Sequence, residues 1–206
     1  MDHDPRHPTR VRSVSRRDIA LMQTTRLTLR PLRPSDADAI VAGVGNYDVS
    51  KWLAVVPFPY THEDARQFLS SSAAERRLTW AICDADAFQG IVSIAGEFGY
   101  WLTRDAWGRG YATEAGTAAI DAAFADPTRT ELRASFMLGN DRSEQVLRKL
   151  GFRQTGVSER SFRAYGQTAP AANLEITRVD WRRSRGLSPR RWWSIAQGSD
   201  MSEPAR

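Results

Sequence analysis

The stretch FGYWLTRDAWGRGYATEAGTAAIDAAFA, residues 98–125, carries the pattern that decides the fold. Its aromatic and aliphatic start predicts a strand over 98–103, a glycine-rich turn follows at 107–110, and an alanine-rich helix then runs to about residue 125. The first N–H groups of a helix have no acceptor inside it, and the helix dipole places partial positive charge there. Because glycines let an anion come close to this backbone, the pattern indicates either a phosphate site or an ordinary helix start.

Two widespread phosphate motifs do not fit this turn. Walker A requires Gly-Lys followed by Ser or Thr, and the sequence has no such tripeptide. The dinucleotide fingerprint requires Gly or Ala three residues after Gly110, where Thr113 stands, and it usually opens a domain. The following helix has small residues on one face, which would admit a sheet or an elongated ligand: Ala112, Ala115, Gly116, Ala119 and Ala123.

Outside this stretch the sequence predicts a mixed α and β body. Further strands are expected at 25–30, 78–83, 90–95, 131–137, 152–157 and 173–179, with a turn at 84–89. Ser35 is expected to cap one helix, with Asp38 in the capping-box position, and Thr61 to cap another. Asn140 begins a third helix, which Gly151 closes.

Length and composition limit the class of protein. A chain of 206 residues, 41% hydrophobic and 26% charged, suits one domain with a real core and is too short for two full enzyme domains. No apolar run approaches the roughly 18 to 20 residues that span a bilayer, and no apolar stretch follows the charged N-terminus, so we expect neither a membrane partner nor a secretory signal. Cys83 is the single cysteine, which excludes an intrachain disulfide and predicts a cytoplasmic location.

Charge divides the chain into three parts. Residues 1–22, a flexible leader, carry five arginines and three aspartates, and residues 182–206, a basic tail, carry six arginines and two acids. The body over 23–181 has 18 basic and 19 acidic residues, so it lacks the basic footprint of a nucleic-acid enzyme.

A second informative block is LGNDRSEQVLRKLGF, residues 138–152. Asn140 can accept a hydrogen bond at the helix start, and Ser143 falls on the same face as Leu147 and Leu150. A serine on a mainly apolar helix face is either a buried hydroxyl bonded to backbone or a site residue.

Together these blocks resemble the GNAT superfamily of acetyl-CoA-dependent N-acetyltransferases, and within it the ribosomal-protein-alanine N-acetyltransferases of the RimJ/RimL type. The similarity covers about residues 23–181 and rests on TTRLTLRPLRPSDADAI (24–40), VPFPYTHEDA (56–65), FGYWLTRDAWGRGYATEA (98–115), GNDRSEQVLRKLGF (139–152) and LEITRVDW (174–181). It implies an α+β fold: a central, splayed, mostly antiparallel sheet of six to seven strands, flanked by about four helices. Acetyl-CoA would enter between the strand ending near Thr103 and the strand at 131–137.

The resemblance also implies how acetyl-CoA, the co-substrate, is held. The family's phosphate motif, Gln/Arg-x-x-Gly-x-Gly/Ala, falls on Trp107, Gly110 and Ala112, with tryptophan in place of Gln/Arg. Since backbone N–H groups bind the pyrophosphate, this departure matters little. The implied cofactor-binding residues are Leu102, Thr103, Trp107, Gly108, Arg109, Gly110, Tyr111, Ala112, Thr113, Asn140 and Ser143.

The implied chemistry is direct attack of a neutral amine on the thioester in a ternary complex. By resemblance, Ser143 would donate a hydrogen bond to the leaving thiolate, and the alternative is that it only orients CoA or caps backbone. No tyrosine lies in the 140–150 helix to take that role. Glu97 and Glu159 are candidate bases for the ammonium proton, each with the alternative of a solvated surface carboxylate. The scattered histidines predict no metal site.

The acceptor is the open part of the prediction. Trp52, Phe58, Tyr60, Tyr100 and Trp101 are expected to wall the acceptor pocket, although such aromatics equally serve as core. The resemblance suggests the N-terminal alanine or serine of a ribosomal protein as the acceptor, and the residues equally allow small amines, amino acids, polyamines or an amine-bearing antibiotic. The alternative function is a non-catalytic CoA sensor, or a module that binds ribosome or RNA through its basic ends. The chain would act as a monomer or homodimer.

Overall fold

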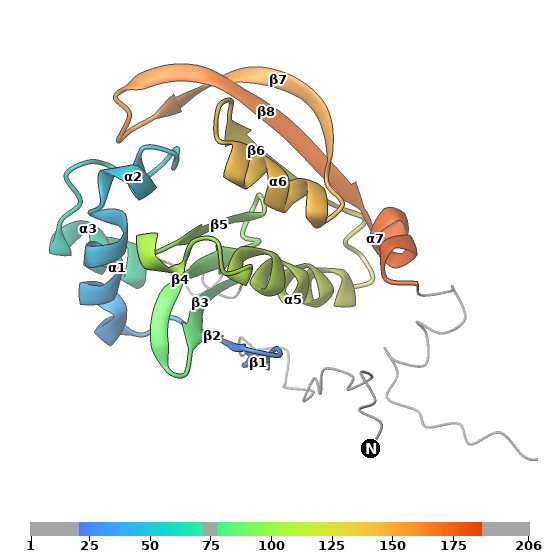
Figure 1. Ribbon diagram of the computed structural model, residues 1–206, viewed down its shortest axis with the longest axis horizontal. Helices are drawn as coiled ribbons and strands as arrows, with labels where there is room; N and C mark the ends of the chain where they lie inside the picture. Colours follow the sequence, from blue (N-terminus) through green and yellow to red (C-terminus); the bar gives the residue numbers. More distant parts are fainter. Residues whose placement is uncertain (1–20, 72–77, 187–206) are drawn as a thin grey trace, which may run out of the picture.

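The computed structural model describes residues 21–71 and 78–186, which form two sheets wrapped by helices (Figure 1). Within these two ranges no helix has the length and apolarity needed to cross a bilayer. The leader prediction falls mostly outside the described residues, which reach back only to Leu21, and the tail prediction lies outside them from residue 187 onward.

The first sheet is antiparallel, and its strands lie in chain order. Its strands are β1 (Met22–Gln23), β2 (Leu27–Pro31), β3 (Thr79–Asp84), β4 (Ala87–Ser93) and β5 (Gly99–Leu102). Leu27 and Leu29 point into the core from β2, as the alternation predicts. The hairpin between β3 and β4 is tighter than the predicted 84–89 turn, since Ala85 and Asp86 alone make the turn, both at positive φ.

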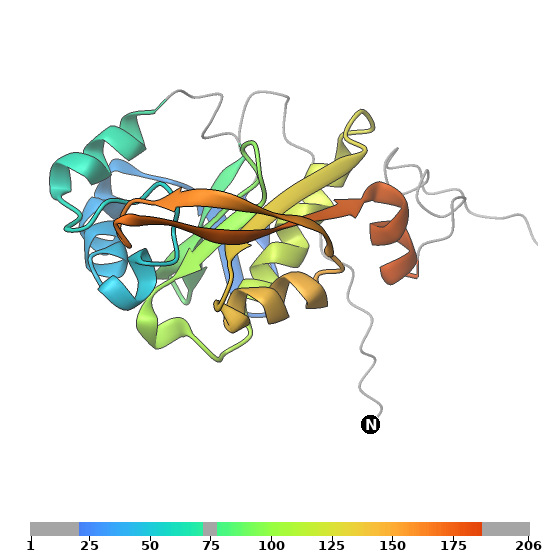
Figure 2. The same cartoon turned by 90° about the horizontal axis from the view of Figure 1, so that it is seen from above.

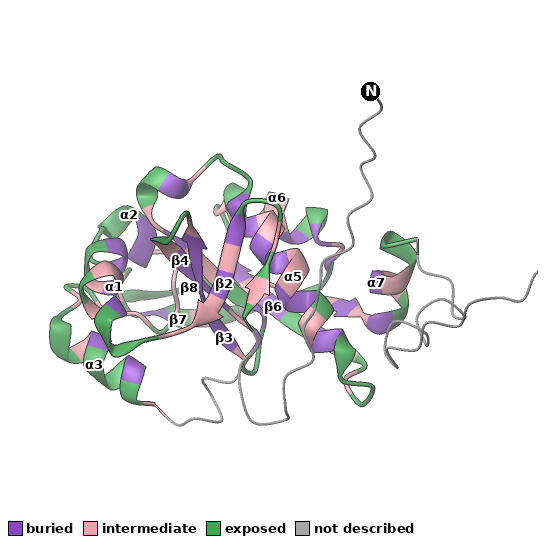
Figure 3. Cartoon of the chain, turned by 90° about the horizontal axis from the view of Figure 1, so that it is seen from below, coloured by how far each residue is buried: buried purple, intermediate pink, exposed green. Residues whose placement is uncertain are grey.

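Helices cover both faces of this sheet. α5 (Tyr111–Ala125) packs on one face, where Val92 joins its core cluster. α1 (Ala37–Val44), α2 (Tyr47–Ser50) and α3 (His62–Ser70) pack on the other, where the adjacent residue Ile91 joins theirs. Figure 3 shows the strands largely buried between exposed outer helix faces.

The two predicted helix starts have different outcomes. Thr61 accepts from the N–H of Asp64, and the Asp64 carboxylate accepts from the N–H of Thr61, so the predicted cap of α3 is confirmed. The Ser35 cap is wrong. Pro34–Asp36 form a short 3-10 turn ahead of α1, and Asp36 accepts from the N–H of Arg33 and forms an ion pair with Arg30 at 2.7 Å. Asp36 stands at the N-cap position of α1, but its side chain makes no cap hydrogen bond because Arg30 and the N–H of Arg33 engage its carboxylate.

The second sheet has the order β6-β8-β7. It consists of β6 (Glu131–Met137), β7 (Arg153–Phe162) and β8 (Gln167–Thr177), with α6 (Asp141–Lys149) between β6 and β7. β7 and β8 form a long hairpin that extends beyond the predicted strands and reaches the α2 region (Figures 1 and 2). The predicted strand end at residue 179 is wrong, because β8 ends at Thr177, which caps α7 (Arg178–Ser184).

The two sheets meet at one point and then separate. Phe98 bridges Ala134 in parallel, and its N–H donates to the carbonyl of Arg133 at 2.7 Å. Beyond this bridge β5 and β6 belong to different sheets. The α+β class with a splayed, mostly antiparallel arrangement is therefore confirmed; residues 21–71 and 78–186 contain eight strands and six α-helices, two of them short.

Candidate active site

A cavity of about 700 Å³ lies where the sheets separate. Its walls come from α1 and α2, the loop after α2, β4, β5, α6 and the β7–β8 hairpin. It extends from the face of the first sheet that carries α1 to the start of α6, so one space reaches both sides of the split.

The glycine turn ends at the N-terminus of α5. Gly108 and Gly110 have φ of +75° and +80°, which favour glycine, and Gly110 is the N-cap of α5. The turn is exposed, and the N–H groups of Tyr111, Ala112 and Thr113 belong to the first turn of the helix, where intrahelical acceptors do not exist. A Cβ added at Gly110 would lie 3.3 Å from the Arg26 guanidinium. An accessible, donor-rich turn of this kind fits a pyrophosphate group.

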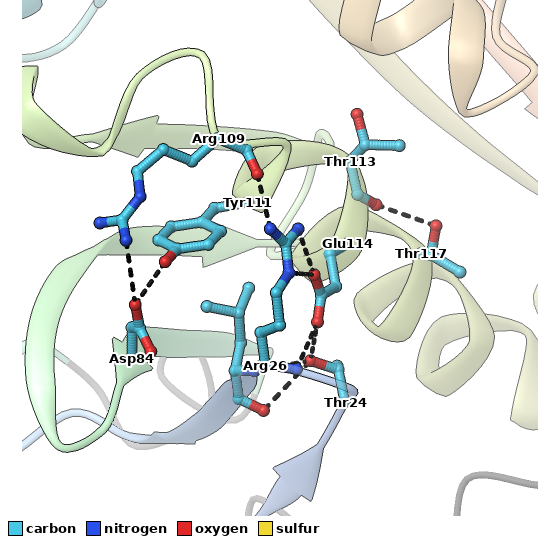
Figure 4. Close-up of polar contacts among 9 residues, drawn as sticks. Thr24, Arg26, Asp84, Arg109, Tyr111, Thr113, Glu114 and Thr117 are labelled. Carbon is cyan, nitrogen blue, oxygen red and sulfur yellow. Dashed lines mark hydrogen bonds and ion pairs between the residues drawn. The ribbon is translucent and has the colours of Figure 1, made fainter. Parts of the chain in front are cut away.

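An ion-paired network fastens the glycine turn to the segment between β1 and β2 (Figure 4). Two nitrogens of Arg26 bind Oε2 of Glu114 on α5, at 2.7 and 2.8 Å, and the third nitrogen donates to the carbonyl of Arg109 at 2.9 Å. Glu114 also accepts from the backbone N–H of Arg26 and from the hydroxyl of Thr24. Burial alone would raise the pKa of Glu114, but these donors hold it below its usual value.

Tyr111 enters this network with its side chain rather than facing the split. Its ring is buried, the guanidinium groups of Arg26 and Arg109 lie over it, and its hydroxyl donates to Asp84 at the β3–β4 turn (Figure 4). Only the backbone N–H of Tyr111 is therefore positioned for the predicted cofactor role.

Trp107, which stands where the family motif has Gln or Arg, ties the turn to the end of β5. Its indole N–H donates to the carbonyl of Leu102 at 3.0 Å. The guanidinium groups of Arg104 and Arg142 lie over its ring, at 4.6 and 4.9 Å from the centroid. Thr103 bonds back to Gln89 of β4 and does not line the cavity, unlike Leu102.

Backbone N–H groups of β5 face the split. The N–H of Phe98 points toward β6, and the N–H of Thr103 points toward β4. Since successive N–H groups in a strand point in opposite directions, those of Tyr100 and Leu102 share the Phe98 direction and point into the opening. These donors suit the carbonyl oxygens of an extended amide or thioester chain.

Ser143 lies in the first turn of α6 and lines the cavity. Its N–H donates to the Asn140 side chain at 3.3 Å, which confirms the predicted cap. Its hydroxyl accepts from the hydroxyl of Tyr100 across the split, at 3.5 Å. Burial raises the pKa of Tyr100 to about 12, so the phenol stays protonated as a donor at neutral pH.

The two candidate bases lie in different places. Glu97 lines the cavity, but Arg160 binds it through two nitrogens at 2.6 and 2.9 Å, and Ser135 donates to it at 3.1 Å. The Arg160 hydrogen bonds hold the pKa of Glu97 below its usual range, so it is a poor proton acceptor at neutral pH. Glu159 is exposed and alternates with the cavity-lining Arg160 along β7, so it points away from the cavity.

The structure brings together most of the predicted acceptor wall. Trp52, Tyr60, Tyr100 and Trp101 line the cavity. Phe58 does not; it is half-exposed and packs edge-to-face on Tyr47, with ring centroids 5.1 Å apart.

The small face of α5 is occupied mainly by protein. A Cβ at Gly116 would come within 2.8 Å of the Leu150 side chain and 3.1 Å of the Phe98 ring. Of the five small residues on that face, only Ala112 lines the cavity. The sheet and α6, rather than an elongated ligand, account for the close approach.

Sequence reasoning missed three arginines that line the cavity, Arg142, Arg160 and Arg163. Arg142 could have been predicted from the sequence, because it stands between the predicted site residues Asn140 and Ser143 at the helix start. The other two lie in the distal half of the hairpin, where neither strand was predicted to extend.

The acetyltransferase (GNAT) domain family matches residues 26–153 of the chain. The N-acetyltransferase p20 of Bacillus licheniformis is 27% identical over 149 residues, covering 66% of this chain and 84% of that protein. The N-acetyltransferase YoaA of Bacillus subtilis is 26% identical over 151 residues, covering 66% and 85%.

Solved structures share the fold at lower identity. Mycobacterium smegmatis RimJ in complex with CoA-disulfide has a TM-score of 0.66 and 21% identity, covering 84% of this chain and 89% of RimJ. The spermidine N-acetyltransferase of Vibrio cholerae, in complex with CoA and spermine, has a TM-score of 0.65 and 19% identity, covering 76% and 98%.

Proposed function

Because the chain belongs to the acetyltransferase (GNAT) family and is an acetyl-CoA-dependent N-acetyltransferase, we propose that it acetylates a primary amine by direct attack within a ternary complex. The acceptor is the N-terminal amine of a protein or a small-molecule amine. One observation carries the proposal: the phosphate-binding turn, the β5 edge and Ser143 surround one cavity that continues to the other side of the sheet.

Each wall has a distinct task toward acetyl-CoA. The N–H groups of residues 111–113 hold the pyrophosphate, while Arg26 fixes the turn through the Arg109 carbonyl. Leu102 and Asn140 flank the pantetheine arm at the split. The N–H groups of Tyr100 and Leu102 face the charge that develops on the thioester oxygen.

The group transfer needs one proton removed and one proton supplied. The amine nitrogen bonds to the carbonyl carbon, the C–S bond breaks, and the Ser143 hydroxyl donates a hydrogen bond to the leaving thiolate. The nitrogen loses its proton to water, and the thiolate takes a proton from water as it leaves. Tyr100 donates to the Ser143 oxygen, which leaves the serine proton directed at the sulfur.

Water, rather than a carboxylate, takes the ammonium proton. Glu97 is held by Arg160, and Glu159 points away from the cavity. Apolar walls disfavour a charged ammonium and so lower the pKa of a bound amine, which makes its loss of a proton easier. The acceptor therefore reacts in the neutral form without a dedicated base.

The test is turnover of acetyl-CoA, followed as free CoA thiol, over a panel of primary amines between pH 6 and 10. We expect kcat/KM to rise with pH along a curve that shifts with each amine's own pKa. Tyr100, with a pKa of about 12, stays protonated between pH 6 and 10, so its ionisation would not lower kcat/KM in this range. A curve set by one group of the protein, whatever the amine, would contradict the absence of a base. Binding of acetyl-CoA with no turnover on any amine would favour a CoA sensor.

A further inference from the structure

The acceptor side of the cavity has an apolar floor. Its half-buried members, Leu53 and Trp101, present surface to the cavity. They are backed by the buried side chains of Ile40, Val44, Val49 and Ile91, which come from α1, α2 and β4. The same residues form one packed cluster, so the floor is held in place by the core beneath it. Such a surface gains free energy by covering an apolar group and loses it by desolvating a charged one.

A roof closes over this floor. Phe162 of the hairpin packs with Trp52 and Ala54 of the loop after α2, and the N–H of Arg163 donates to the carbonyl of Ala54 at 3.1 Å. The roof therefore joins two segments that are more than a hundred residues apart in the sequence. At the mouth, Val55 and Phe68 remain exposed at 77% and 38%, so the entrance is apolar as well.

The charges around the cavity do not favour a polycation. Its lining contains the carboxylates of Asp64 and Glu97 and the guanidinium groups of Arg142, Arg160 and Arg163. Both carboxylates are engaged, Glu97 with Arg160 and Asp64 with the cap of α3 at Thr61. A second ammonium group on the acceptor would meet arginines and apolar walls rather than a free carboxylate.

We propose that the acceptor is a small primary amine that carries one aromatic or branched aliphatic group and no second cationic group. The inference rests on the proposed function, because it assigns the substrate class of the same cavity. Arg160 is the specificity-determining residue: by holding Glu97, it removes the carboxylate that would otherwise attract a diamine or polyamine.

The experiment compares 2-phenylethylamine, spermidine and an Ala-Ala-Ala amide as acceptors. We expect kcat/KM for 2-phenylethylamine to exceed that for spermidine by about 10- to 100-fold. Arg160→Met releases Glu97, so it should raise kcat/KM for spermidine by about tenfold. Arg153→Met is the matched control: Arg153 is on the same strand, is paired with Asp180, and lies outside the main cavity, so the preference should not move.

Calorimetry of each amine with the protein–CoA complex separates this inference from the proposed function. Binding of 2-phenylethylamine without turnover upholds the inference while the proposed function fails. A wild-type preference for spermidine, a preference for the peptide amide over both free amines, or no binding of 2-phenylethylamine would each overturn the inference. An Arg160→Met protein with an unchanged preference would overturn the role of that arginine.

Discussion

The phosphate-binding turn and the acceptor cavity are built in different ways. The turn is one continuous stretch, 107–113, whose donors are backbone N–H groups. The acceptor cavity draws its walls from α1, α2, two strands and a hairpin that are far apart in the sequence, and it presents side chains. Backbone donors tolerate many side chains around them, whereas a wall of side chains changes with every substitution. The first region therefore keeps a common co-substrate, and the second sets which amine is accepted.

The largest effect on the binding of acetyl-CoA is expected from a side chain introduced into the glycine turn. Gly110→Glu should lower the affinity for acetyl-CoA by about 100-fold or more, because a carboxylate would repel the pyrophosphate and φ of +80° strains any residue with a Cβ. Calorimetric titration with acetyl-CoA measures the loss. Gly166→Glu is the matched control, since φ is +78° there and no atom lies within 4 Å of its Cβ position. Wild-type affinity in Gly110→Glu would remove the turn from the site.

The second-largest effect is expected at Ser143, where the C–S bond of acetyl-CoA breaks between the turn and the acceptor cavity. Ser143→Ala should lower kcat by about 10- to 100-fold and leave the KM for acetyl-CoA nearly unchanged, because the hydroxyl acts on the leaving sulfur. Ser135→Ala is the control, since this serine also lines the cavity but donates to Glu97. Steady-state kinetics with saturating amine measure both. If KM rises while kcat stays constant, Ser143 only orients acetyl-CoA.

A smaller effect is expected from the network that fastens the turn. Arg26→Ala removes the donor to the Arg109 carbonyl, so the KM for acetyl-CoA should rise by about 3- to 10-fold with kcat nearly constant. Arg66→Ala breaks a comparable exposed pair on α3, with Glu63, and should change neither constant. Equal effects in the two variants would show that Arg26 contributes only general stability.

The smallest effect is expected at Glu97. Because Arg160 holds its pKa low, Glu97→Gln should change kcat on an apolar amine by less than about threefold, whereas loss of a true general base costs roughly 100-fold or more.

The same variant tests the effect of the ion pair on stability. The pKa of Glu97 is lower in the folded protein than in the unfolded chain, so the pair stabilises the fold fully above the unfolded pKa, and this stabilisation is lost as pH falls through the folded pKa. Glu97→Gln should therefore flatten the acid side of the stability curve, measured by thermal unfolding from pH 3 to 7.

How well the sequence predicted each part depended on the range of the interactions. Thr61, Asn140 and the helix at 111–125 were predicted correctly because caps and helix starts are decided by residues three or four apart. The Ser35 cap was wrong because Ser35 lies inside a 3-10 turn, and α1 begins only after Asp36, whose carboxylate is paired with Arg30 of β2. The distal hairpin was missed because its pairing partners, rather than its own apolar pattern, keep residues such as Glu159 and Pro170 in strands.

By itself the sequence determined the mixed α and β body, the glycine turn ahead of α5 and the serine at the start of α6, since each rests on local periodicity or on positions that require glycine. The split of the sheet was expected only from the resemblance to a known family. Only the tertiary structure decided which partners the charged and hydroxyl side chains have, and which residues wall the acceptor side of the cavity. It placed Arg160 on Glu97, 63 positions earlier in the chain, directed Tyr111 to Asp84, and set Tyr100 opposite Ser143. The reason is physical: a pKa or a cavity wall depends on neighbours in space, and folding of the whole chain chooses those neighbours.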